Sequence, residues 1–191
     1  MLKAFGLLVN ATKTKLMMIN PAHTKQAVPM VAAVDGSPLL CVSEMKLLGL
    51  IFDDSLTWWP LVNDLTGRTR RKIWALHRLR EAGASTEVLK VIYVTRVRSI
   101  LEYGAAVWGC VISGLQAKNI EKVQMNALQV VLDPESWSYE ANLRQLDLEK
   151  LSVRRESLIH KFAISTTMFP SNTGITFTSP AKVYTSPRHC S

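Results

Sequence analysis

The spacing of apolar residues changes near residue 54. Before this point, short apolar runs alternate with turn-forming residues, and after it apolar residues recur at steps of three and four. The first pattern is typical of strands and the second of amphipathic helices. We therefore expect an α+β protein with a β-rich part over residues 1–54, a mostly helical part over 55–168 and a loose tail over 169–191.

The β-rich part contains three or four strand candidates. Short apolar runs occur at residues 15–19 and 46–52, and two more, at 30–34 and 39–42, flank the tetrapeptide Asp35-Gly36-Ser37-Pro38. Asp-Gly between apolar runs favours a hairpin, because both residues tolerate positive φ. A small sheet that includes one hairpin follows from this pattern.

Four helices are expected after residue 54. Thr57 can cap the first, which tolerates Pro60 in its first turn and ends at Gly83. Ser85 can cap the second, the third stops before Pro134, and the fourth starts after residue 147. The apolar stripes of the four helices are, in order, Trp58, Leu61, Leu65, Thr69, Ile73, Leu76 and Leu79; Leu89, Tyr93, Val97 and Ile100; Ile120, Val123, Ala127 and Val130; and Leu151, Leu158 and Phe162.

The positive charge of the chain is concentrated in the first two helices. Lys and Arg total 23 against 15 Asp and Glu, a formal net charge of +8 with a pI near 9.6. Between residues 68 and 98, nine basic residues stand against two acidic ones, a local balance of +7. Such a balance favours a polyanionic partner, nucleic acid before an acidic membrane surface.

The nine basic residues are therefore candidates for nucleic-acid binding. Paired helices that carry Arg and Lys can straddle a phosphate backbone without reading base sequence. The alternative is a solvated helix surface whose long side chains cover apolar neighbours. For Trp58, Trp59, Trp74 and Trp108 we expect core packing rather than base stacking. The candidate binding residues are Arg68, Arg70, Arg71, Lys72, Arg78, Arg80, Lys90, Arg96 and Arg98.

No set of residues forms a convincing active site or metal site in the sequence. Phe52-Asp53-Asp54 has the form of a polymerase metal hairpin, but the acidic residues before it are Asp35, in a turn, and Glu44, at a strand edge. We interpret Asp53-Asp54 as a turn that leads into a helix. The three cysteines and four histidines are dispersed without metal-ligand spacing. We expect no catalytic residue, no metal site and no cofactor.

Localisation is also inferred from composition. Three scattered cysteines are typical of reduced thiols, and the opening apolar stretch lacks a signal-peptide pattern. The most apolar internal run, residues 103–112, is half the roughly 20 residues that a membrane helix needs. We expect an intracellular protein of the nucleus or cytoplasm that is neither secreted nor membrane-embedded.

Several motifs, in their order and spacing, resemble one family. Residues 6–17 read Gly-Leu-Leu-Val-Asn-Ala-Thr-Lys-Thr-Lys-Leu-Met, and Lys46-Leu47-Leu48-Gly49 runs into Asp53 and then Leu56-Thr57-Trp58. Landmarks further on are Ile100 to Gly104, Ile120 to Gln124 and Leu143 to Leu146. Together these motifs, over about residues 3–165, resemble the C-terminal palm and thumb of reverse transcriptases from non-LTR retrotransposons of the long interspersed, jockey-like kind.

The resemblance implies a division of roles. Residues 1–54 correspond to part of a palm and 55–168 to a thumb that grips the template-primer, and Lys13 lies near the phosphates of the incoming nucleotide. The family's Mg²⁺-holding aspartate hairpin and its fingers would lie before Met1. We therefore expect a truncated reverse-transcriptase-like protein that does not polymerise but retains binding to an RNA–DNA hybrid or duplex.

Other functions stay open at this stage. The amphipathic helices and an exposed strand edge also fit a helical module that binds a protein partner, such as the missing half of a polymerase. A retroelement remnant without function is the third reading. The sequence leaves the oligomeric state open.

Overall fold

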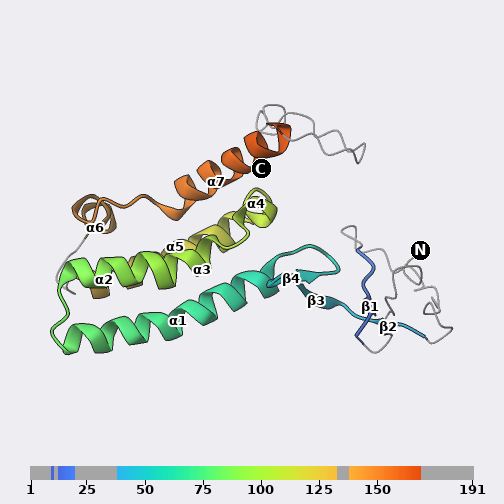
Figure 1. Ribbon diagram of the computed structural model, residues 1–191, viewed down its shortest axis with the longest axis horizontal. Coiled ribbons are helices and arrows are strands. Elements are labelled where there is room, and N and C mark those ends of the chain that lie inside the picture. The colour runs from blue at the N-terminus through green and yellow to red at the C-terminus, as the bar shows by residue number, and fades with distance from the viewer. Residues whose placement is uncertain (1–9, 11–12, 20–37, 133–137, 169–191) are drawn as a thin grey trace. The chain divides into compact units, whose positions relative to one another are not determined.

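The computed structural model describes residues 10, 13–19, 38–132 and 138–168 of the 191-residue chain. It is a mixed α+β structure in which helices predominate, with two small sheets (Figure 1). The chain divides into two compact units, Met1–Asp64 and Leu65–Ser191. The hairpin expected around Asp35-Gly36 and the tail expected over 169–191 lie outside the described residues.

Four short strands occur in the described part of the first unit. Strand β1 (Lys15–Leu16) pairs in parallel with β2 (Leu40–Cys41), and β3 (Glu44–Leu47) pairs antiparallel with β4 (Leu50–Asp53). The amide of Val42 donates to the carbonyl of Leu16 at 2.9 Å and extends the first pairing. The strand candidates at residues 15–19 and 39–42 each contain a strand, and the candidate at 30–34 lies outside the described residues. The parallel pairing of β1 with β2 was not predicted.

The expectation of one strand over residues 46–52 is wrong. The chain reverses at Leu48 and Gly49, whose φ angles are 48° and 86°, and Leu47 faces Leu50 across the ladder. Two central residues with positive φ are typical of the tight turn that matches the twist of a hairpin. Gly49 adopts this conformation without a Cβ clash, and Leu48 is exposed at the tip. The turn was not predicted because Leu48 is apolar, whereas turn positions usually carry Gly, Asn or Asp.

The bounds of helix α1 (Trp59–Glu81) follow the prediction, but Leu79, the last residue of its expected apolar stripe, is exposed. Pro60 occupies the first turn, where its missing amide costs no hydrogen bond, and Gly83 adopts a φ of 85° just beyond the last turn. Leu65, Thr69 and Leu76 are fully buried on one side of the helix. Thr69 satisfies its hydroxyl by donating to the carbonyls of Leu65 and Thr66 at 3.0 and 2.9 Å.

The second predicted helix is a continuous rod of three segments. These are α2 (Thr86–Ile92), the π-helix η2 (Tyr93–Arg98) and α3 (Ser99–Glu102). Ser85 caps it as expected by accepting from the amide of Val88 at 3.5 Å. The buried residues recur at steps of four and end at Leu101 rather than Ile100; they are Leu89, Tyr93, Val97 and Leu101. The wider π turn keeps residues four apart on one side, which an α-helix would not do over three such steps.

The remaining helices complete the second unit. They are α4 (Ala105–Trp108), α5 (Gly114–Leu132), α6 (Tyr139–Gln145) and α7 (Leu151–Met168), of which α4 and α6 were not predicted. Helix α7 packs against α4 and α5, and α5 also contacts α2 and α6 (Figure 1). A Cβ at Gly109 would lie 2.5 Å from the carbonyl oxygen of Ala105 within α4 and 3.2 Å from Cδ1 of Ile159 on α7. Glycine therefore avoids a clash at the end of α4 and leaves room for α7.

A polar network crosses the core of the second unit. Tyr93 donates to Oε1 of Gln124, and Nε2 of Gln124 donates to the hydroxyl of Tyr139 and to the carbonyl of Glu149, each at 2.9 Å. Tyr139 in turn donates to Glu121, which also accepts from the backbone amide of residue 151 at 3.1 Å. Burial raises the pKa of both tyrosines, so their hydroxyls remain proton donors. The network joins η2, α5, α6 and the start of α7.

Phe162 departs from its predicted place. It was assigned to the buried stripe of the fourth helix, but it is 52% exposed. Leu151, at the start of the same helix, is buried, and Leu158 is half-buried. The apolar stripe of α7 therefore lies against the core at its beginning and emerges from it further on.

Candidate nucleic-acid interface

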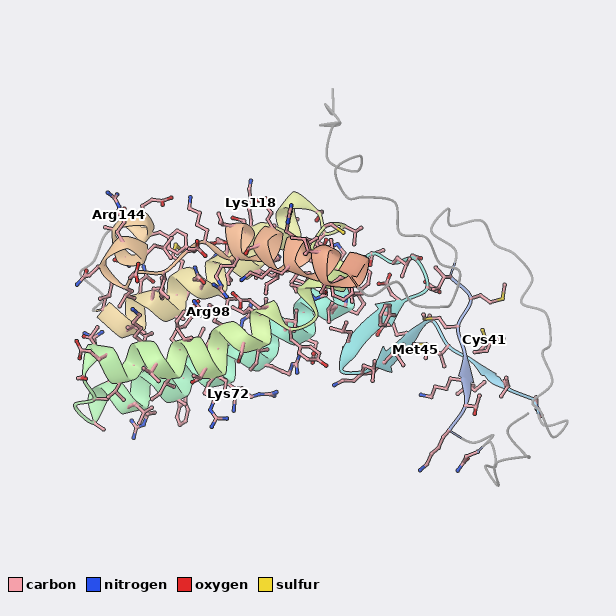
Figure 2. All side chains as sticks on the ribbon, turned by 45° about the horizontal axis from the view of Figure 1, so that its top comes forward. Cys41, Met45, Lys72, Arg98, Lys118 and Arg144 are labelled. Carbon is pink, nitrogen blue, oxygen red and sulfur yellow. The ribbon has the colours of Figure 1, made fainter. Side chains whose placement is uncertain are left out.

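The nine basic residues between 68 and 98 fall into two groups by exposure. Arg70, Arg71, Lys72 and Arg78 of α1 and Arg96 of η2 are exposed. Arg68, Arg80, Lys90 and Arg98 are half-buried. Figure 2 shows the contrast for two labelled residues, with Lys72 projecting into solvent and Arg98 lying among the helices. The exposed group is the one available to a polyanion.

Three of the exposed arginines surround an aromatic residue. Trp74 is 67% exposed, and its neighbours on the helix surface are the residues three and four positions away. All four of these positions carry a basic residue or a histidine, and all four side chains are exposed. We call this surface the Trp74 face; it consists of Trp74, Arg70, Arg71, His77 and Arg78.

The assignment of Trp74 to the core was wrong. Successive residues of a helix are rotated by about 100°, so Trp74, nine positions after the buried Leu65, lies about 180° around α1 from it. The same rotation, applied to the sequence, could have placed Trp74 among the arginines. Trp58 and Trp108 are buried as expected, and Trp59 is half-buried. Lys72 lies on another side of the helix, about 160° from Trp74.

Arg80 has a structural contact. Its Nη1 donates to the carbonyl oxygen of Val130 at 2.6 Å. Val130 lies in the last turn of α5, where backbone carbonyls have no partner within the helix. Arg80 thus joins the end of α1 to the end of α5 and is directed inward, unlike Arg78, which forms an exposed ion pair with Glu81 at 2.7 Å.

Arg98 is held in a second internal contact. Its Nε lies 3.8 Å from Oε1 of Glu102, and the same carboxylate receives two hydrogen bonds from Arg154 of α7. The hydrogen bond to Glu102 raises the pKa of Arg154. Both ion pairs are largely shielded from solvent, so Arg98 contributes to the packing of α3 against α7.

The other candidates occupy separate places. Lys90 is half-buried on α2, and Arg96 is exposed on η2. Arg68 is half-buried, with Nε and Nη2 shielded from solvent. Lys13 belongs to the first unit and is exposed. It lies in a turn, where its backbone amide donates to the carbonyl of Asn10 at 3.1 Å.

A groove adjoins the Trp74 face between α1 and α5. Its cavity volume is about 650 Å³, and Ile73 and Val130 supply its apolar lining. His77 belongs both to this groove and to the Trp74 face. The remaining lining residues are polar or charged: Arg80, Glu81, Asn126 and Gln129.

Asp53 acts as an acceptor for the backbone that leads into α1. Its Oδ2 accepts from the amide of Thr57 at 2.8 Å and its Oδ1 from the amide of Trp58 at 3.0 Å. Burial acts to raise the pKa of Asp53, but these hydrogen bonds outweigh it and hold the pKa below the usual value. The residue is the helix lead-in that the sequence indicated, and Thr57, the expected cap, accepts through Oγ1 from the amide of Trp59, the first residue of α1, at 3.5 Å.

Glu44 lies directly opposite Asp53 in the β3–β4 ladder, a pairing that the sequence did not require. Glu44 is exposed, whereas the carboxylate of Asp53 is occupied by backbone amides. In the part of the chain that the structure describes, His, Cys, Asp and Glu nowhere form a group of three or more suited to a metal ion. Among the same residues, none of the helices is long and apolar enough to cross a membrane.

Comparison with known proteins provides no family assignment. The chain matches no family model, no curated protein and no solved structure.

Proposed function

We propose that this protein binds nucleic acid through the Trp74 face of α1 and does so without recognising base sequence. The observation that carries the proposal is the presence of three exposed arginines on one side of a single helix. Arg70 and Arg71 have no acidic partner among the described residues, and Arg78 has an exposed one that a phosphate can replace.

The distribution of charge supports a polyanion as the partner. The segment 68–98 carries nine basic and two acidic residues, within a chain whose net charge is +8. Arginine presents planar donors that match phosphate oxygens, and contacts of this kind position a nucleic acid without reading its bases. The internal roles of Arg80 and Arg98 reduce the number of cations available, but the remaining ones are clustered.

The resemblance to reverse transcriptases of non-LTR retrotransposons adds the kind of nucleic acid. A thumb grips a template-primer, so the proposed ligand is an RNA–DNA hybrid or a duplex. We propose further that this chain does not polymerise. Asp53, which the sequence places in a segment with the form of a polymerase metal hairpin, accepts two backbone amides that lead into α1, and this turn role is in agreement with that view.

Binding of a labelled RNA–DNA hybrid to the purified chain at several salt concentrations tests the proposal. Each neutralised phosphate contributes about −0.9 to the slope of log K against log salt concentration, so we expect a steep decrease in affinity. Absence of binding by a chain that circular dichroism shows to be folded would contradict the proposal. Template-dependent extension of a primer in the presence of Mg²⁺ would contradict the claim that the chain does not polymerise.

A second function is favoured by an apolar strip in the second unit. Tyr103, Val107, Val111 and Leu115 recur at steps of four and are each about half exposed. These residues lie in α4, at the start of α5 and in the turns beside these helices, and exposed apolar side chains gathered in one segment favour a protein-interaction site. A protein partner on this strip would leave the Trp74 face unoccupied, so the two functions can be separated by substitutions on α1.

A further inference from the structure

The Trp74 face combines an exposed aromatic ring with cations in a way that a phosphate-binding surface alone does not need. In the described part of the structure, the indole ring makes no ring contact with another aromatic residue or with a cation, and its Nε1 has no hydrogen-bond partner. The buried Trp108 differs, because its Nε1 donates to the carbonyl of Tyr103 at 2.9 Å. Among the described residues, Trp74 therefore stabilises the fold through neither a ring contact nor a hydrogen bond.

The four neighbours of Trp74 define what can approach it. Three arginines attract a polyanion to the ring's edge, and the fourth neighbour, His77, leads into the groove. An apolar protein segment would have to desolvate these cations, whereas a nucleic acid brings phosphates to them and a base to the ring. The chemistry of the surface therefore favours a nucleic-acid ligand over an apolar one.

From this arrangement we infer that Trp74 is a base-stacking residue and that the ligand of the Trp74 face has an unpaired tract. The inference rests on the proposed function and restricts its ligand to nucleic acids that contain unpaired bases. A base in an intact duplex is covered on both faces by its neighbours and cannot stack on a side chain of an external helix. A single strand, or the overhang of a duplex, exposes base faces, and stacking on an aromatic ring accepts any base.

The groove beside the Trp74 face defines a path for a nucleic-acid strand along α1. Its volume of about 650 Å³ exceeds what one side chain displaces, and its polar lining includes the amides of Asn126 and Gln129. Arg70 lies one helical turn before Trp74 and Arg78 one turn after it, so phosphates on both sides of a stacked base meet a guanidinium. A strand that runs along α1 uses all of these groups without bending the helix.

Equilibrium binding of the full chain to two ligands tests the inference. The ligands are a single-stranded oligothymidine and a blunt RNA–DNA hybrid of the same length, and the variants are Trp74→Ala and Trp74→Phe. Loss of one stacked base predicts about 5- to 150-fold weaker binding of the single strand by Trp74→Ala. Binding of the hybrid should not change, and Trp74→Phe should retain most of the affinity because it keeps an aromatic face.

A matched control separates stacking from loss of an exposed apolar side chain. Val91 on α2 is 60% exposed and has no aromatic ring, so Val91→Ala should leave both affinities unchanged. Alanine is the better helix former, so Trp74→Ala should retain the helix, and circular dichroism checks this. The difference in tryptophan fluorescence between the wild type and Trp74→Phe isolates Trp74, and oligothymidine should quench it.

Each other outcome has a distinct meaning. Equal weakening of single strand and hybrid by Trp74→Ala would overturn the stacking role, as would wild-type affinity of Trp74→Ala for the single strand. In both cases the proposed binding by the arginines would stand. Failure of the folded wild type to bind either ligand would remove the proposed function itself. Self-association that depends on Trp74, with no binding of oligothymidine, would instead assign the face to a second copy of the chain.

Discussion

Arg154 donates two hydrogen bonds to Glu102, a residue fifty-two positions earlier in the chain, and so fixes α7 against the end of the α2–η2–α3 rod. Both oxygens of the carboxylate are used, which is the paired geometry in which arginine binds a carboxylate most specifically. Arg98 shares the same carboxylate at 3.8 Å. This contact explains why a cation on the basic second helix is directed inward and is not available to a ligand.

Replacement of Glu102 with Gln should therefore destabilise the second unit. The substitution removes the charge that two partly buried guanidinium groups share, which we expect to cost about 2 kcal/mol of unfolding free energy. Urea denaturation followed by circular dichroism measures it. Glu140 provides a matched control, because its ion pair with Lys150 is solvent-exposed and Glu140→Gln should lower the free energy of unfolding much less than Glu102→Gln. Equal effects of the two substitutions would contradict the structural role of Glu102.

Charge reversal on the Trp74 face should abolish most nucleic-acid binding. The triple variant Arg70→Glu, Arg71→Glu and Arg78→Glu removes three phosphate contacts, so we expect at least about tenfold weaker binding to the hybrid and a salt slope smaller by about 3. Fluorescence anisotropy at several salt concentrations measures both quantities. Association with a protein partner through the apolar strip should be unaffected.

The control for this experiment changes net charge by the same amount at other sites. Lys118 and Lys122 of α5 and Arg144 of α6 are exposed, and Figure 2 labels Lys118 and Arg144. Joint replacement of the three residues with Glu should leave most of the binding intact. Loss of binding in this control to the same extent as in the triple variant would show that overall charge, rather than the Trp74 face, attracts the ligand.

Arg80 and Arg78 should respond oppositely to the same substitution. Arg80→Met retains the length of the side chain but removes the donor to the carbonyl of Val130, which should lower stability by about 1–2 kcal/mol and leave the salt slope of binding unchanged. Arg78→Met breaks an exposed ion pair, so it should alter stability by less than about 0.5 kcal/mol while weakening binding. Denaturation curves of the two variants measure the change in stability, and binding curves at several salt concentrations measure the salt slope. A change in the salt slope with Arg80→Met would contradict its structural role and place Arg80 at the interface.

Asp53 should make the start of α1 sensitive to acid. Its pKa is held below the unfolded value, so its stabilising effect is complete above about pH 4 and is lost as the pH falls through the folded pKa. Asp53→Asn removes one of two acceptors for backbone amides and should cost about 1 kcal/mol at neutral pH. The difference in the free energy of unfolding between Asp53→Asn and the wild type should become smaller in strong acid, where Asp53 itself is protonated.

Hydrogen exchange of the Thr57 and Trp58 amides reports this effect locally. Both amides should exchange faster in Asp53→Asn than in the wild type at neutral pH. Asp54 is the matched control, since its carboxylate accepts from the neighbouring Ser55 hydroxyl at 2.9 Å, and Asp54→Asn should leave the two amides protected. Unchanged protection in Asp53→Asn would exclude Asp53 as the helix lead-in.

Elements that depend on neighbouring residues could be predicted well. The limits of α1 follow from an apolar stripe, Pro60 near its start and Gly83 just after its end, and the cap of α2 follows from Ser85. These signals act within one or two helical turns, so no knowledge of the tertiary structure is needed to interpret them. The four long helical segments were predicted for this reason.

Elements whose signal is weak or non-local were missed. The turn at Leu48-Gly49 divides a run of apolar residues that reads as one strand, and only the ladder between Leu47 and Leu50 reveals it. The pairing of β1 with β2 joins residues that are about 25 positions apart. Helices α4 and α6 are too short to show a period.

For the candidate interface, the sequence determined where the basic residues lie along the chain, and the tertiary structure determined which of them are exposed. A count of residues was enough to locate the excess positive charge on α1, α2 and η2, because charge is a property of each side chain and needs no partner. Whether an arginine faces solvent or a protein group depends on a residue from another part of the chain: Val130 for Arg80, and Glu102 with Arg154 for Arg98. Such contacts form only when distant helices pack, since a hydrogen bond to a particular oxygen requires both groups to be brought within about 3 Å.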